Sequence, residues 1–129
     1  MREIMFRGVR EDNKLWAYGD LRHWRNGRVG IHNNELTYTL SVDPETVGQY
    51  TGLVDKNSQK IFEDDLVEVT LPATIAQPEF SWGVCKVIFA EGCFGVLTSR
   101  EFIPIRSFAP RVEFEVVGNI FGKEENCNA

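Results

Sequence analysis

The 129-residue sequence lacks most of the features that reveal chemistry. Its three cysteines are odd in number and none forms a C-x-x-C pair, which argues against a disulfide framework and a zinc knuckle. The histidines are His23 and His32, and no G-x-S-x-G, H-E-x-x-H or P-loop motif is present. These absences predict a protein that is not an enzyme and that carries no metal or cofactor.

Long hydrophobic segments are also missing. No apolar run approaches the ~20 residues that cross a bilayer. Residues 1–10 alternate charged with apolar residues, unlike a signal peptide. Hydrophobic residues make up 43% of the chain and charged residues 26%, the balance of an ordinary globular domain. We therefore expect a soluble protein of the cytoplasm, without membrane association.

Charge is unevenly distributed along the chain. The formal net charge is −5, so phosphate backbones repel the chain on average. Residues 1–30 nevertheless hold seven Lys and Arg against four Asp and Glu, a local excess of +3. Such an asymmetry has two readings, a binding face or a pair of complementary surfaces within one domain.

Hydrophobic periodicity predicts many short strands and almost no helix. Residues 36–42 alternate apolar and polar side chains, with the apolar set at Leu36, Tyr38, Leu40 and Val42. Residues 112–120 alternate in the same way, which predicts a closing strand. At most one short helix is expected, at 44–47 or 99–107, so the alternative fold class is α+β with one short helix.

Two hairpins are predicted from their turn residues. A turn at Glu91-Gly92 would place Phe89 opposite Phe94 and Val87 opposite Val96, as core pairs. Asn26-Gly27 is a preferred pair for a two-residue type I′ turn. That turn would pair Trp24 with Val29 and Arg22 with Ile31, which directs Trp24 to the core and leaves the opposite face to His23, Arg25 and Arg28.

A distinctive pattern spans residues 2–121 in four segments, Arg2–Arg7, Val42–Asn57, Lys60–Val67 and Glu115–Phe121. In this order the segments resemble the signature of the YopX family of phage and prophage proteins. The family usually has Gly where Ser58 and Asp64 stand, so either Ser58 adopts any positive φ that its turn needs or the turn differs slightly.

Together with the strand pattern, the resemblance implies a mostly β fold. We expect an N-terminal β meander over 1–42, an SH3-like β-barrel over 43–121 and a flexible tail over 122–129. The polar residues of the signature are open to two readings, as supports for tight corners or as ligand-facing groups. The run Glu63-Asp64-Asp65 is interpreted as a solvated turn, because consecutive strand residues point to alternate faces and rarely converge on a cation.

Two functional hypotheses follow. The first is a non-catalytic interaction module encoded by a phage or prophage, which binds a host or phage protein in the bacterial cytoplasm. Short edge strands would also favour a homo-oligomer. The second is a nucleic-acid-binding small β-barrel that uses the basic-aromatic hairpin over 22–32. The core-facing prediction for Trp24 and the negative net charge weigh against the second hypothesis, whose candidate site residues are Arg22, Arg25, Arg28 and His32.

Overall fold

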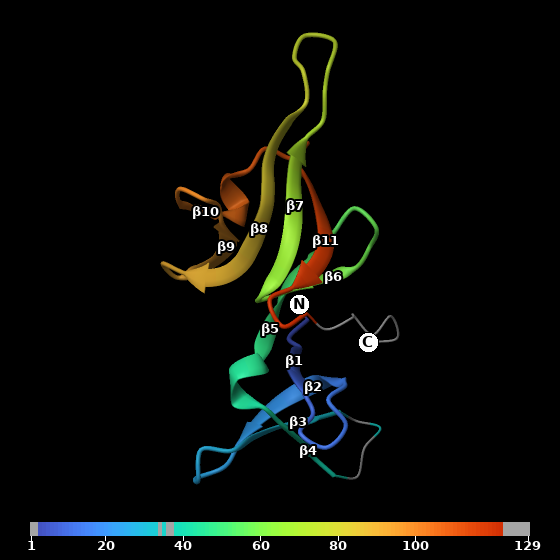
Figure 1. Ribbon diagram of the computed structural model, residues 1–129, viewed down its shortest axis with the longest axis vertical. Helices are drawn as coiled ribbons and strands as arrows, with labels where there is room; N and C mark the ends of the chain where they lie inside the picture. The colour runs from blue at the N-terminus through green and yellow to red at the C-terminus, as the bar shows by residue number, and fades with distance from the viewer. Residues whose placement is uncertain (1–2, 34, 36–37, 123–129) are drawn as a thin grey trace. The chain divides into compact units, whose positions relative to one another are not determined.

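The computed structural model describes residues 3–33, 35 and 38–122, and in that part of the chain the fold is mostly β, as predicted. The two helix-like elements described are the 3₁₀ turns η1 (Pro44–Thr46) and η2 (Ile105–Ser107), which lie in the two segments where one short helix was expected. No helix of the described residues is long and apolar enough to cross a membrane. The strands, shown in Figure 1, are β1 Phe6–Val9, β2 Trp16–His23, β3 Val29–His32, β4 Leu40–Val42, β5 Gly48–Val54, β6 Lys60–Phe62, β7 Asp65–Leu71, β8 Phe80–Ala90, β9 Cys93–Leu97, β10 Phe102–Pro104 and β11 Glu113–Asn119.

The chain forms two compact units, and the boundary between them lies within β5, between Gly52 and Leu53. One antiparallel sheet has the strand order β4-β3-β2-β1-β5-β6, and the other has the order β10-β9-β8-β7-β11. The expected division into a meander over 1–42 and a barrel over 43–121 stays a prediction. Of the expected tail over 122–129, all but Gly122 lies outside the described residues.

In the first unit, one face of the β2–β3–β4 sheet builds a small core. The register sets Leu21 opposite Ile31, and Ile31 opposite Leu40 on the next strand. Ile31 is fully buried and Val42 is almost so. Arg7 on β1 is also buried, and its guanidinium carbon lies 4.3 Å from the ring centroid of Trp16, a cation–π contact. On the face of β2–β3–β4 away from the core, Arg22 is exposed, whereas His32 and Ser41 are half-buried.

The predicted two-residue turn of the β2–β3 hairpin is wrong by one residue. His23 lies opposite Val29, and the amide of Trp24 donates to the carbonyl of Arg28 at 2.9 Å. The loop is thus three residues long, 25–27, and Gly27 closes it with φ +85°. A three-residue loop of this kind combines a type I turn with a left-handed residue that forms a bulge. The one-residue change of register moves side chains to the opposite face, so Trp24 is not in the core.

The strand predicted over 36–42 is shorter than expected. β4 begins at Leu40, and Leu36 lies outside the described residues. Tyr38, expected on the buried side, is 60% exposed because it precedes the strand and takes no part in its alternation.

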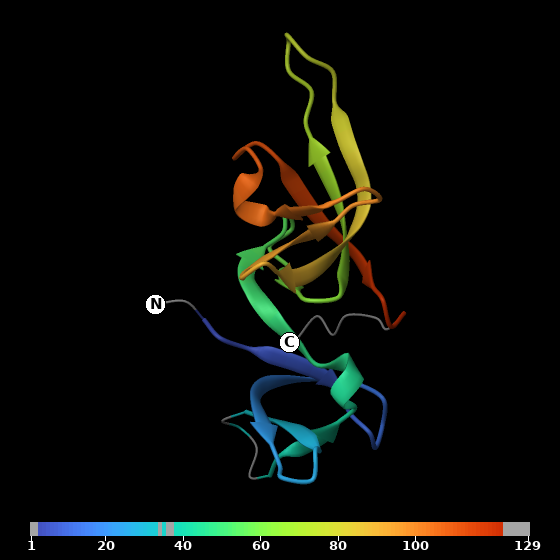
Figure 2. The ribbon, with the colours of Figure 1, turned by 90° about the vertical axis from the view of Figure 1, so that its left-hand side faces the viewer.

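The second unit contains a five-stranded antiparallel sheet. Strands β7 to β10 form a meander, η2 follows, and β11 then returns to pair with β7. Figure 2 shows the curvature of β8 and β9. Hydrogen bonds that close the barrel between β10 and β11 are not found among the described strand pairs. The core of this unit consists of Ile61, Val67, Val69, Cys85, Val87 and Val96.

The β8–β9 hairpin has the predicted register. Phe89 faces Phe94 with ring centroids 5.1 Å apart, and Val87 faces Val96, both fully buried. Phe89 itself is 55% exposed, so its pair with Phe94 lies at the margin of the core rather than inside it.

Polar residues of the segment Val42–Asn57 bind backbone groups at the corners of the fold. The Asp43 carboxylate accepts from the Glu45 amide at 3.1 Å at the start of η1. The Thr46 hydroxyl donates to the Asp43 carbonyl and accepts from the Val9 amide at 2.8 Å. These contacts give Asp43 and Thr46 a structural role.

Asp55 joins the turn after β5 to β11. One carboxylate oxygen accepts from the amides of Asn57 and Gln59, at 2.8 and 2.9 Å. The other accepts from the amide of Val116 at 2.9 Å, across a sequence separation of 61 residues. Asp55 is 6% exposed, so these charge-assisted bonds are shielded from water.

The prediction of a solvated turn at 63–65 is wrong for Asp65. Asp65 is fully buried, and its carboxylate accepts from the Phe62 amide at 2.7 Å. Asp64 takes φ +71°, which turns the chain sharply enough to bring the two groups together. Ser58 takes φ +66°, so the positive φ expected at this position is confirmed.

Asp55→Ala is expected to lower the free energy of unfolding by about 3 kcal/mol, because three backbone amides lose a charged acceptor in a buried setting. Urea denaturation would measure the change. Asn57→Ala is the matched control, since the exposed Asn57 contributes its backbone amide to the turn and keeps it. A loss for Asp55→Ala no larger than for Asn57→Ala would contradict the structural role of Asp55.

Candidate functional site

The solvent side of the β2–β3–β4 sheet presents an aromatic side chain among basic ones. Arg22, Gly30 and Ser41 lie opposite one another across the three strands. Because side chains alternate along a strand, Trp24, Arg28 and His32 share this side. We call this surface the Trp24 face and define it as Arg22, Trp24, Arg28, Gly30, His32, Thr39 and Ser41.

Trp24 is 43% exposed and its ring is held over Gly30. A Cβ atom added to Gly30 would come within 2.8 Å of Cη2 of Trp24 and 2.5 Å of Cγ2 of Thr39. A side chain at position 30 would therefore displace the Trp24 ring or Thr39, and glycine leaves room for the indole where it lies. The ring therefore lies on the Trp24 face over β3, with Trp24 directly after β2, which carries Arg22, and Arg28 directly before β3.

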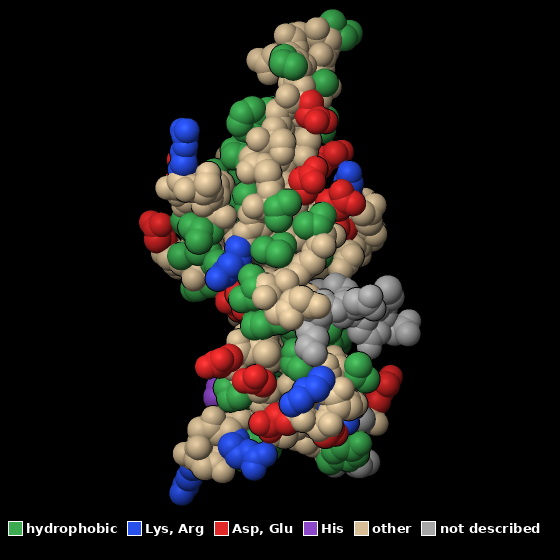
Figure 3. Space-filling view, viewed as in Figure 1, with side chains coloured by type: hydrophobic (Ala, Val, Ile, Leu, Met, Phe, Trp, Pro, Cys, Tyr) green, Lys and Arg blue, Asp and Glu red, His purple; other side chains and the backbone are tan. Residues whose placement is uncertain are grey.

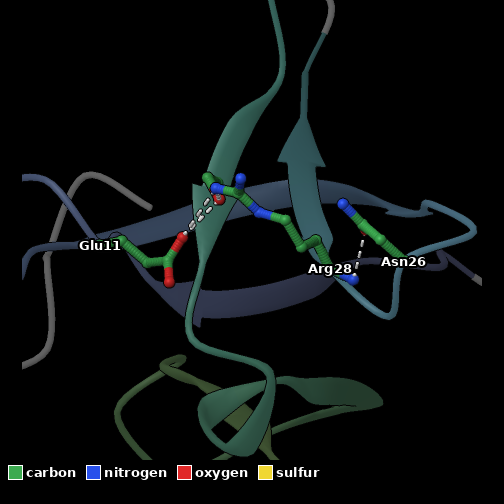
Figure 4. A network of polar contacts seen from close by, with 4 residues as sticks. Glu11, Asn26 and Arg28 are labelled. Carbon is green, nitrogen blue, oxygen red and sulfur yellow. Dashed lines mark hydrogen bonds and ion pairs between the residues drawn. The ribbon is translucent and has the colours of Figure 1, made fainter.

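A polar network fixes one side of the Trp24 face (Figure 4). The Arg28 guanidinium donates to Ser41 Oγ at 3.1 Å and lies 3.5 Å from Glu11 Oε1. Ser41 Oγ donates to the same Glu11 oxygen at 2.6 Å. The backbone amide of Arg28 donates to Asn26 Oδ1 at 3.0 Å, which ties the network to the hairpin loop. The Arg28 side chain is thereby held beside β4.

The hydrogen bond from Ser41 and the neighbouring Arg28 guanidinium lower the pKa of Glu11. A lowered pKa keeps the carboxylate ionised throughout the neutral range. The network is complete above the ordinary pKa of a glutamate and is lost as the pH falls through the lowered pKa of Glu11.

Among the other arginines near the Trp24 face, one forms an ion pair within the described residues and two do not. Arg10 is paired with Asp12, whose carboxylate oxygen lies 2.7 Å from the guanidinium. Arg22 and Arg25 are exposed and form no ion pair among the described residues. In Figure 3, Lys and Arg side chains gather at the lower left, at the end of the first unit where β2 and β3 are joined. An open pocket of about 640 Å³ adjoins this end and is lined by Trp24, Arg25, Asn26, Arg28 and Ser41.

The structure brings three of the four predicted site residues, Arg22, Arg28 and His32, onto one face. The fourth, Arg25, lies in the loop beside them. Sequence reasoning missed the exposure of Trp24 and the supporting residues Glu11, Gly30 and Ser41. One signal was available for Trp24: only the three-residue loop pairs apolar Leu21 with apolar Ile31.

The second unit carries an acidic surface over β7 and β11 (Figure 3). Glu68 lies directly opposite Glu115, and Lys56 Nζ is 3.6 Å from the Glu115 carboxylate. Like charges in that arrangement repel, and the lysine offsets part of the repulsion. No group of three or more His, Cys, Asp or Glu that could hold a metal occurs within the described residues. The acidic side chains on this surface therefore give no evidence of a metal-binding site within the described residues.

The cysteines fall into different environments. Cys85 is buried, and burial raises the pKa of its thiol. A raised pKa disfavours the reactive thiolate, which fits a structural role for this buried cysteine. Cys93 is half-buried, and Cys127 lies outside the described residues.

Ser41→Ala is expected to raise the pKa of Glu11 toward its ordinary value, because the variant removes the hydrogen bond that contributes most to the lowering. An NMR titration of the Glu11 side-chain carboxyl carbon would measure it. Ser107→Ala, at an exposed serine of the second unit, is the control and should leave the pKa of Glu11 unchanged. Equal pKa values in wild type and Ser41→Ala would show that the network does not form in solution.

Comparison with known proteins adds the family. The model of the family described as "YopX protein" matches residues 5–126, nearly the whole chain. The comparisons with curated proteins and with solved structures found no match. The family match agrees with the resemblance seen in the signature segment and covers both units. This chain belongs to the YopX protein family.

Proposed function

We propose that the chain is a non-catalytic interaction module, encoded by a phage or prophage and acting in the bacterial cytoplasm, that holds its partner on the Trp24 face. The observation that carries the proposal is the exposure of Trp24. A large aromatic side chain in a small unit is usually buried, because burial of its surface stabilises the fold. Here Trp24 lies on the solvent side of a sheet whose other side forms the core.

The support beneath Trp24 strengthens the proposal. Gly30 leaves space for the ring, and Thr39 contacts the same space. A ring that is already positioned loses little conformational freedom when a partner covers it, and such preorganisation favours affinity. Exposed tryptophan and arginine are the residue types that contribute most to binding at interfaces.

The charged groups of the face are suited to holding a ligand. Arginine stays protonated in proteins and presents several N–H donors in a planar arrangement. Glu11 has a lowered pKa and is engaged by Ser41 and Arg28, so it orients Arg28 rather than exchanging protons near neutral pH. These features support recognition without chemical conversion.

The partner class follows from this chemistry only in part. Arg22 and Arg25 favour an anionic group, and Trp24 favours an apolar or planar one. A host or phage protein partner, expected from the sequence, and a homo-oligomer formed through short edge strands both remain predictions.

Affinity capture from a bacterial lysate tests the proposal, with the full chain as bait and with nuclease-treated and untreated lysates. The wild type should retain a partner in a fixed stoichiometry, and Trp24→Ala should retain at least about tenfold less, as expected for a central interface residue. Phe89→Ala, at an exposed aromatic residue of the second unit, is the matched control and should behave as wild type.

Two results would overturn the proposed function. Equal retention by Trp24→Ala and wild type would show that the partner binds elsewhere. Absence of any retained protein or nucleic acid, in all variants and in both lysates, would remove the support for an interaction module.

A further inference from the structure

We infer that the occupant of the Trp24 face is a short stretch of single-stranded nucleic acid, with one base stacked on Trp24 and the adjoining phosphates bound by Arg22 and Arg25. The inference rests on the proposed function, because it names the ligand of the same surface. It also reverses one argument of the sequence analysis, which set Trp24 in the core and thereby removed the aromatic group that a nucleobase needs.

The aromatic part of the site fits a base. Proteins that bind single strands without sequence preference stack bases on exposed aromatic rings, and every base has a π face. Trp24 is 43% exposed and its Cη2 end is fixed over Gly30. The ring lies on the open face of a sheet, where an unpaired base can stack on it. Bases inside a duplex are already stacked on one another and do not expose a face to Trp24.

The charges around the ring fit phosphates. Arg22 and Arg25 form no ion pair among the described residues, so their guanidinium donors are available. Guanidinium groups bind phosphate through paired N–H donors. The Arg28 guanidinium is already bonded to Ser41 and paired with Glu11, so it adds positive charge near the ring but does not bind a phosphate directly.

The same charges limit the size of the ligand. Asp20 precedes Arg22 by two residues on β2 and lies opposite His32, so this exposed acidic residue is on the same side of the sheet as the Trp24 face. With a net charge of −5, the rest of the chain repels a polyanion at long range. We therefore expect contact with about two phosphates and modest affinity that depends on salt.

The test uses fluorescence anisotropy with labelled single-stranded DNA and RNA of about eight nucleotides and the full chain. With about two phosphates neutralised, log Kobs should fall with log salt at a slope of about −1.4. Arg25→Gln should make the slope shallower by about 0.7. Arg106→Gln, an equal change of charge at an exposed residue of the second unit, should leave the slope unchanged.

Substitutions at Trp24 separate stacking from charge. Trp24→Ala should weaken binding about tenfold or more, whereas Trp24→Phe should retain most of the affinity because the ring persists. Binding should quench the tryptophan emission of the wild type and not that of Trp24→Phe, since Trp16 is 6% exposed and Trp82 packs against a core.

Three results would overturn the inference: no anisotropy change with single-stranded DNA or RNA at low salt, equal affinity for wild type and Trp24→Ala, or equal affinity for a duplex of the same sequence. The proposed function fails separately. If single strands do not bind but a protein is captured from nuclease-treated lysate in a Trp24-dependent manner, the interaction module stands and its ligand is a protein.

Discussion

The loop between β2 and β3 has three residues, and this length determines the side of the sheet on which each hairpin side chain lies. Gly27 makes the loop through its left-handed conformation, and the Trp24 amide then bonds to the Arg28 carbonyl. In this register Leu21 and Ile31 pair on the core side. Trp24 and Arg28 consequently face solvent together, so the length of this loop determines both the Trp24 face and the core of the first unit.

In each of the two units, buried polar side chains hold corners of the chain. Thr46 bonds to the start of η1 and to β1, and Asp55 bonds to its own turn and to β11. Asp65 accepts from the backbone just before it. A tight corner leaves amides without strand partners, and a side-chain oxygen satisfies them at low cost in chain length. In this chain, Thr46, Asp55 and Asp65 thus serve to bind backbone groups.

Much of the fold could be predicted from the sequence, and the failures have physical causes. The β8–β9 register followed from one turn and two apolar pairs that admit a single alignment. Asn26-Gly27 fits a two-residue loop and a three-residue loop equally, so the choice depends on which strand residues find partners in the core. Asp65 was read as solvated because a run of carboxylates is usually exposed, and its burial depends on the positive φ of Asp64. The wrong loop length at Asn26-Gly27 also affected the candidate site: its arginines were predicted, but Trp24 was assigned to the core.

The central claim is that Trp24 lies on the solvent side, over Gly30. A NOESY spectrum of the isotopically labelled full chain measures this directly. We predict a cross-peak between Hη2 of Trp24 and the Hα protons of Gly30, together with inter-strand contacts that place His23 opposite Val29. Inter-strand contacts that place Trp24 opposite Val29, with indole cross-peaks to the core valines, would contradict the claim and the functional proposals built on it.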